Sequence, residues 1–169
     1  MPDFPIVDAH VHLADPKRFG YAWTANAPSL NRTVLPAEFF EAAAPVKIEK
    51  FVFVEVDVDL PQHVAEAEWI DGLALSEPKL AGMVAALPLE QGKAVAGDLE
   101  EIARLKAARG IRRLIQNQAD PDFCIQPKFI EGLKLLPQHD LVFDICIFHH
   151  HLPNAIKMVR QCTEVRFVL

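Results

Sequence analysis

The chain alternates short apolar runs with longer segments of helical periodicity, and this alternation limits the folds that it can adopt. Six runs are rich in β-branched and aromatic residues, as expected of strands that are covered on both faces. They are residues 6–13, 51–57, 80–87, 110–116, 141–149 and 165–169. Because strands that alternate with helices form βαβ units, the pattern predicts an α/β fold with a parallel sheet.

Five segments between these runs carry the start signals and the apolar stripes of helices. Proline opens or precedes most of them, which suits the first turn of a helix. The expected helices are residues 36–47, a segment after Pro61, a segment that ends at Gly110, one that starts near Pro127 and one from Pro153. Each helix leads from one strand to the next, so the chain repeats one βα unit.

Two architectures satisfy this repeat, an open doubly wound sheet and a closed barrel. An open nucleotide-binding sheet usually has a glycine-rich turn after its first strand. Here the first run ends in His10-Val11-His12, and no glycine occurs before Gly20. The sequence therefore favours a TIM-type (β/α)8 barrel.

The repeats are fewer than a complete barrel requires. Eight units occupy about 250 residues, whereas this chain of 169 residues holds only about six strands and five helices. We therefore expect residues 1–169 to form a single incomplete barrel domain that is truncated at its C-terminus. A self-contained six-stranded fold is the alternative.

The strongest chemical signal is the pair of histidines at the end of the first run. Alternate residues of a strand point to the same side, so His10 and His12 share one face. Active sites of barrels lie at the carboxyl ends of the strands, and two neutral imidazoles can bind one divalent cation. Glu55 lies near the end of the second run, and a cation would balance its charge in these apolar surroundings. The pattern predicts a metal site formed by His10, His12 and Glu55, with zinc as the expected ion.

Composition and charge argue against several classes of function. The net charge of −6 is spread along the chain, which disfavours nucleic-acid binding and a polybasic membrane surface. The three cysteines lack the spacing of a disulfide framework, and Cys146 is expected to pack as a small apolar side chain. No run approaches the ~18 apolar residues of a membrane span, and the first residues do not resemble a signal peptide. We expect a soluble cytoplasmic protein.

These motifs resemble the amidohydrolase superfamily, whose first strand typically ends in H-x-H. Residues 110–116 (GIRRLIQ) with 121–123 (PDF), and 143–147 (FDICI) with 149–153 (HHHLP), are similar to the sugar-lactonase branch of the amidohydrolase-2 family. That branch includes L-fuconolactonases, L-rhamnono-lactonases and the 2-pyrone-4,6-dicarboxylate lactonase. The resemblance implies a further histidine, from the continuation of the sixth strand beyond Leu169, and an aspartate from the eighth strand.

The resemblance also implies roles for residues near the ends of the fourth and fifth runs. Arg112 is expected to contact the oxygen atoms of the substrate, because a guanidinium can make two hydrogen bonds to them. A structural ion pair is the alternative, and Gln116 shares the face of Arg112. His149 is expected to bind substrate and His150 to act in catalysis, although three adjacent histidines cannot all face the opening.

The long segment 14–35, between the first strand and the first helix, is expected to cover the site, as long loops of barrels often do. Tyr21 and Trp23 are expected to stack on the apolar face of a sugar. Anchoring of the loop by its own aromatic residues is the alternative. Asp57 and Asp59 are assigned to the turn and to the helix entry that follow the second run.

Together these features predict a hydrolase that opens a small cyclic ester, a sugar 1,4-lactone, by means of a metal-activated water. In a variant of the mechanism, which the resemblance allows, the histidines activate water without metal. The alternatives are a decarboxylase of the amidohydrolase-2 type and a non-catalytic fragment that needs a partner. The expected partners are the lactone itself and either a second copy of the chain or a complementing C-terminal chain.

Overall fold

The computed structural model describes residues 4–169, and its centre is a single six-stranded sheet. The strands are β1 (Ile6–Val11), β2 (Ile48–Val54), β3 (Leu80–Ala86), β4 (Ala108–Leu114), β5 (Val142–Cys146) and β6 (Phe167–Val168). Their order in the sheet is their order in the chain, and every neighbouring pair is parallel. This is the strand order of a (β/α)8 barrel, and the sheet curls into a partial barrel of this type.

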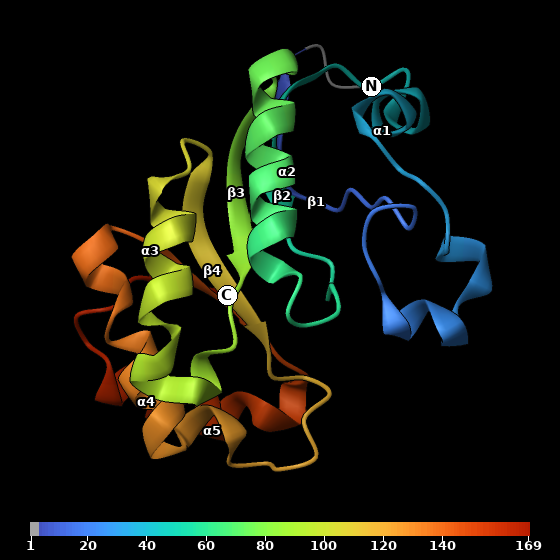
Figure 1. Ribbon diagram of the computed structural model, residues 1–169. Helices are drawn as coiled ribbons and strands as arrows, with labels where there is room; N and C mark the ends of the chain where they lie inside the picture. Colours follow the sequence, from blue (N-terminus) through green and yellow to red (C-terminus); the bar gives the residue numbers. More distant parts are fainter. Residues whose placement is uncertain (1–3) are drawn as a thin grey trace.

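One α-helix follows each of the first five strands. The helices are α1 (Pro36–Ala43), α2 (His63–Ser76), α3 (Ala96–Arg104), α4 (Pro127–Leu133) and α5 (Leu152–Gln161). Figure 1 shows α2 and α3 lying along one face of the sheet, against β3 and β4. Six strands and five α-helices were predicted from the sequence, and both numbers are confirmed.

The main core lies between the sheet and these helices. Phe51, Met83, Ile111 and Phe143 come from four successive strands, and each is fully buried. Burial of one such side chain contributes about 1.5–3 kcal/mol, so this layer fixes which face of each strand meets the helices. The next residue along β4, Arg112, consequently points to the other face, which is the inside of the partial barrel.

For several strands, the predicted carboxyl end is wrong. The second ends at Val54 rather than residue 57, and the fifth ends at Cys146 rather than residue 149. Apolar composition continues beyond the last residue that has a partner in the neighbouring strand, so composition alone overextends a strand. The first helix ends at Ala43 rather than residue 47, because the residue before Pro45 disfavours helical backbone angles.

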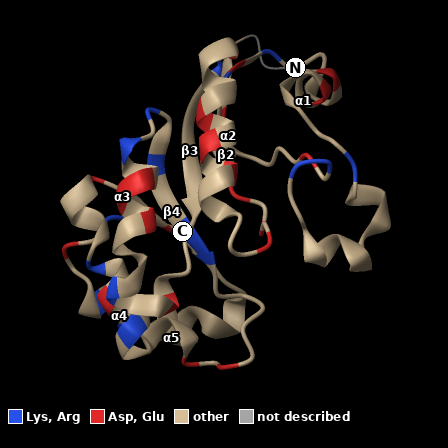
Figure 2. Ribbon diagram, in the orientation of Figure 1, with Lys and Arg blue, Asp and Glu red and all other residues tan. Residues whose placement is uncertain are grey.

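In the sequence, the spread of charge argued against nucleic-acid binding, and the shortness of the apolar runs argued against a membrane span. Figure 2 shows acidic and basic residues interspersed along the ribbon of residues 4–169, without a continuous basic stripe. Within the same residues, no helix combines the length and the hydrophobicity that crossing a bilayer requires.

Candidate functional site

A pocket of about 450 Å³ opens where the carboxyl ends of β1, β2, β4 and β5 meet. Its lining residues are His10, His12, Trp23, Val56, Asp57, Arg112, Leu114, Gln116, Asn117 and Cys146. The structure therefore brings together five of the residues that the sequence singled out: both histidines of the first strand, the arginine and glutamine of the fourth, and the tryptophan of the loop. This end of the sheet is where barrel enzymes place their active sites.

The two histidines of β1 converge on one point. Their Nε2 atoms are 3.3 Å apart, and the rings are perpendicular with centroids 4.9 Å apart. Nδ1 of His12 lies 2.8 Å from the carbonyl oxygen of Val54. A carbonyl oxygen only accepts, so Nδ1 carries the proton and Nε2 keeps a free lone pair in neutral His12. Burial lowers the pKa of His12 and so favours this neutral form.

Arg112 adds a second constraint on the histidine pair. Its Nη1 lies 3.4 Å from Nε2 of His10. Because a guanidinium only donates, this contact places a lone pair on that nitrogen too. Two nitrogens that bind zinc at about 2.1 Å in a tetrahedral arrangement are about 3.4 Å apart. The separation of the histidine pair therefore fits a shared divalent cation.

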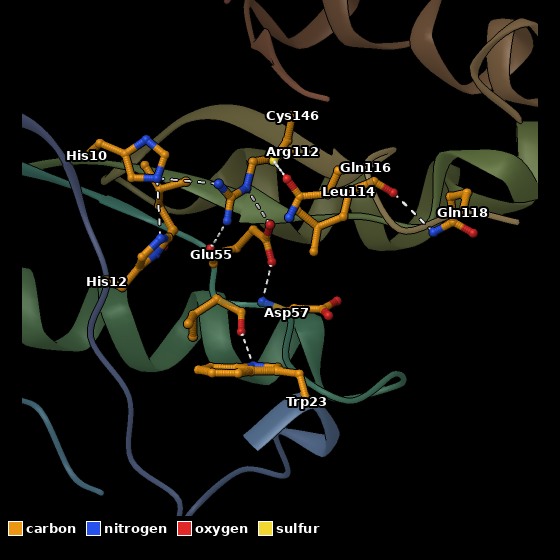
Figure 3. A network of polar contacts seen from close by, with 12 residues as sticks. His10, His12, Trp23, Glu55, Asp57, Arg112, Leu114, Gln116, Gln118 and Cys146 are labelled. Atoms are coloured by element: carbon orange, nitrogen blue, oxygen red, sulfur yellow. Dashed lines mark hydrogen bonds and ion pairs between the residues drawn. The ribbon is translucent and has the colours of Figure 1, made fainter. Parts of the chain in front are cut away.

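Glu55, which was predicted as a third metal ligand, lies elsewhere. Its carboxylate is 2% exposed and accepts a hydrogen bond from Nε of Arg112 at 2.5 Å, while the Arg112 Nη2 donates to its backbone carbonyl. Figure 3 shows it directed toward Arg112 rather than toward the midpoint of the histidines. No group of three or more His, Cys, Asp or Glu side chains is arranged to hold a metal ion within residues 4–169.

Glu55 instead forms an ion pair with Arg112, which lines the pocket. Both side chains are buried, which makes their charges dependent on each other. The second carboxylate oxygen of Glu55 accepts the backbone N–H of Asp57 at 2.6 Å. One carboxylate thus holds both the guanidinium and the turn after β2. The alternative role that the sequence left open for Arg112, a structural ion pair, is realised, and Arg112 also lines the pocket.

The two aromatic residues of the loop 14–35 have different environments. Trp23 lines the pocket, and its Nε1 donates to the carbonyl oxygen of Val56 at 2.8 Å. Tyr21 is 5% exposed and does not line the pocket; its hydroxyl contacts Glu66 at 3.5 Å. The predicted contact of Tyr21 with substrate is therefore replaced by an anchoring role. Burial of Tyr21, reinforced by the charge of Glu66, raises its pKa.

Backbone hydrogen bonds tie the same loop to the segment between β2 and α2. The Gly20 N–H donates to Gln62 and the Ala22 N–H donates to Asp59, both at 2.7 Å. The N–H of Asp59 donates back to the carbonyl oxygen of Gly20 at 2.9 Å. The assignment of Asp59 to the connection before α2 is confirmed, and its carboxylate also fixes the loop that carries Trp23.

His149 and His150, the predicted substrate-binding and catalytic histidines of the fifth strand, do not line the pocket. They lie in a 3-10 turn, His149–His151, that begins after β5 has ended. Both are exposed, whereas His151 is buried and its Nδ1 accepts the N–H of Phe148 at 3.1 Å. The chain turns away because no neighbouring strand pairs with residues 147–149, so the alternation of a strand no longer applies there.

Sequence reasoning missed three polar residues of the pocket. Asp57 was assigned only to a turn, Cys146 only to packing, and Asn117 was not considered. Cys146 pairs in register with Leu114, and its thiol donates to Oε1 of Gln116 at 3.4 Å. Burial, followed by the charge of Glu55, raises the pKa of Asp57. Asp57, Cys146 and Asn117 each lie at or just after the end of a strand, and this position in the sequence could have marked them as pocket residues.

Known proteins with related sequence or structure include two hydrolase-type relatives and a decarboxylase. The chain is 26% identical to the L-fucono-1,5-lactonase of Burkholderia ambifaria over 96% of this chain and 55% of that protein. An amidohydrolase from Burkholderia multivorans with bound zinc has a TM-score of 0.78 at 23% identity, over 96% of this chain and 56% of its own. A 2,6-dihydroxybenzoate decarboxylase from Rhizobium has a TM-score of 0.63 at 10% identity, over 99% and 65%.

The chain spans between 55% and 65% of the length of these three proteins. The two structural likenesses show the fold. The family assignment comes from the sequence, because the amidohydrolase family (Amidohydro_2) matches residues 7–169, nearly the whole chain. This chain, with its partial (β/α)8 barrel and its histidine pair at the end of β1, belongs to the amidohydrolase family.

Proposed function

We propose that this chain carries the histidine pair and the substrate pocket of a hydrolase that opens sugar lactones. The observation that carries the proposal is the convergence of the Nε2 atoms of His10 and His12, 3.3 Å apart and beside Arg112, in a pocket at the carboxyl end of the sheet. The likeness to an L-fucono-1,5-lactonase supports the ester class.

His10 and His12 would hold a divalent cation, with zinc favoured because a related amidohydrolase structure contains it. When bound, such a cation polarises a carbonyl oxygen and lowers the pKa of a coordinated water to about 7. Arg112 lies next to His10, and its fixed N–H groups are suited to stabilise negative charge that develops on a lactone oxygen. Glu55 keeps the guanidinium in place, so Arg112 need not reorganise when the substrate binds.

The charge balance of the pocket favours an uncharged substrate. Arg112 is the sole lysine or arginine among the lining residues of the described chain, and Glu55 already neutralises it. A dicarboxylated pyrone or a benzoate would need cationic donors besides Arg112 and the one divalent cation to offset the cost of removing its carboxylates from water. A sugar lactone needs an aromatic wall and polar groups, which Trp23 and Gln116 supply.

A substrate panel tests this reaction class. With this chain co-expressed with a complementing chain, as described below, we expect hydrolysis of L-fucono-1,5-lactone and related sugar lactones, monitored by proton release, and no turnover of 2-pyrone-4,6-dicarboxylate. Decarboxylation of 2,6-dihydroxybenzoate would contradict the proposal and favour the decarboxylase alternative. His10→Ala and His12→Ala are expected to abolish hydrolysis. His139→Ala is the matched control, because His139 lies in a 3-10 turn outside the pocket.

Zinc binding tests the histidine pair without relying on activity. Titration calorimetry of the chelator-treated chain should show one bound zinc ion. His10→Ala and His12→Ala should each lose it, because one remaining imidazole is too weak a site, whereas His139→Ala should retain it. Equal zinc binding by wild type and both variants would contradict the assignment of the pair as metal ligands.

We further propose that a complementing chain completes the site, because residues 4–169 supply only two converging metal ligands. The test is co-expression with the part of the Burkholderia ambifaria lactonase that lies outside the match. Activity that appears only in the co-expressed pair, and that is lost with His10→Ala in this chain, would support the proposal. Full activity of this chain alone would contradict it.

A further inference from the structure

Asp57 has an unusual backbone conformation at the edge of the pocket. It follows β2 with a φ of 56°, in the left-handed region that few residues other than glycine occupy, although aspartate tolerates it. The bond from its N–H to the Glu55 carboxylate at 2.6 Å holds this conformation. Figure 3 shows the Asp57 carboxylate pointing away from both Glu55 and Arg112. The backbone thus directs a second carboxylate away from the Glu55–Arg112 ion pair.

Nothing within residues 4–169 donates a hydrogen bond or forms an ion pair with this carboxylate, although Asp57 is partly buried. The nearby cations are already engaged. Arg112 is bound to Glu55, and Arg113 makes a two-point contact with Glu90, at 2.6 Å and 2.9 Å. A carboxylate that loses water without gaining donors is costly. A ligand that brings its own donors would offset this cost.

Trp23 lines the same pocket and offers an apolar ring face, and Gln116 and Asn117 add amide groups. An aromatic face combined with a carboxylate and amides is complementary to a ring that is apolar on its faces and carries hydroxyl groups at its rim. Carboxylated rings would be repelled by Asp57. The residues of the pocket therefore discriminate between hydroxylated and carboxylated substrates.

We infer that Asp57 is a specificity-determining residue that accepts hydrogen bonds from ring hydroxyl groups of the substrate. This inference rests on the proposed function and narrows its substrate class to uncharged, polyhydroxylated lactones. Asp57 takes no part in the bond-breaking step. It selects the ring that reaches the histidine pair.

The test compares two stable analogues of cyclic esters, a polyhydroxylated δ-lactam and δ-valerolactam, which lacks the hydroxyl groups. Calorimetry should show tighter binding of the hydroxylated lactam to the wild-type chain. Asp57→Asn should weaken its binding about tenfold, because a charge-assisted hydrogen bond becomes a neutral one, and should leave δ-valerolactam unchanged. Asp57→Gly, which suits the same φ, should abolish the preference.

Asp140→Asn is the matched control, because Asp140 has a φ of 57° but lies outside the pocket. It should bind both lactams as the wild type does, and circular dichroism should show that all variants are folded. If Asp57→Asn keeps the preference for the hydroxylated lactam, the inference is overturned while lactone binding stands. If the wild type binds neither lactam, the proposed function fails and this inference with it.

Discussion

At the scale of single residues, the buried Glu55–Arg112 pair combines a structural and a functional role. Replacement of one partner leaves the other charge buried without compensation, which typically costs about 3–5 kcal/mol. We expect Glu55→Gln to lower the free energy of unfolding by about 3 kcal/mol in urea denaturation. The contrast is Asp140→Asn, which removes an exposed pair with Arg166 and should change stability by less than about 1 kcal/mol. Equal effects of the two variants would rule out a buried charge at Arg112.

The stability of the folded chain also depends on the ionisation of the Glu66 carboxyl group. Burial, reinforced by the charge of Glu55, raises the pKa of Glu66 from 4.5 to about 8. The folded chain therefore binds more protons than the unfolded chain between these values, so stability falls as the pH rises from about 4.5 to about 8. Below this window the contribution of Glu66 is fully present, and above it that contribution is lost.

Glu66→Gln removes this ionisation. The variant should be more stable than the wild type at pH 9, by on the order of 2 kcal/mol, and its unfolding free energy should depend less on pH between 5 and 8. Chemical denaturation of both proteins at pH 9 and at several pH values between 5 and 8 measures the two effects. Glu68→Gln on the exposed side of the same helix serves as the control and should preserve the wild-type slope. An unchanged slope in Glu66→Gln would show that the carboxyl ionises normally.

At the scale of elements, close contact between α4 and the connection after β3 depends on a glycine. A Cβ at Gly132 would lie 2.5 Å from the carbonyl oxygen of Leu89, which is backbone and cannot rotate away. Gly132→Ala should therefore destabilise the chain by about 1–3 kcal/mol. Gly72→Ala, inside α2 with open space around its Cβ, should stabilise it by about 1 kcal/mol. Opposite shifts of the denaturation midpoint are the expected result, and a neutral Gly132→Ala would contradict this packing.

The order of the elements could be predicted from the sequence because each β-branched run and each proline-led helix carries a local signal. The ends of strands could not, because they depend on pairing between segments that are distant in the chain. β2 starts at Ile48, before the apolar run that marked it, since Ile48 pairs with Ile6. β5 ends at Cys146, so the histidines that follow leave the sheet.

The residues of the candidate site also fall into two groups, those that a local sequence pattern predicts and those that depend on distant segments. His10 and His12 follow from strand alternation, which is local, and Arg112 follows from the resemblance of the segment 110–116; the structure brings all three together. The partner of Glu55 could not be predicted from local sequence. Its charge was correctly expected to need a partner, but whether that partner is a cation or the Arg112 guanidinium depends on the position of β4 relative to β2. Strand β3 separates the two in the sheet.

At the scale of the whole molecule, the described sheet has two edge strands, and exposed apolar side chains gather at both. Val7 of β1 is 59% exposed and Val168 of β6 is 50% exposed. Beside β6, Leu152, Ile156 and Leu169 line an apolar groove of about 240 Å³. Edge strands with free backbone groups and apolar side chains pair readily with other chains. We predict that this chain self-associates through the β6 edge and the adjoining face of α5.

Light scattering after size-exclusion chromatography should show an apparent mass that rises with concentration. Val168→Lys should lower this mass toward that of the monomer, because a lysine on an edge strand must keep its charge in water and so opposes pairing. Leu75→Lys is the matched control. Leu75 is 79% exposed near the end of α2, a helix that packs against the inner strand β3, and its replacement should leave the mass unchanged. If Leu75→Lys lowers the mass as much as Val168→Lys does, association reflects general hydrophobicity and not the edge of the partial barrel.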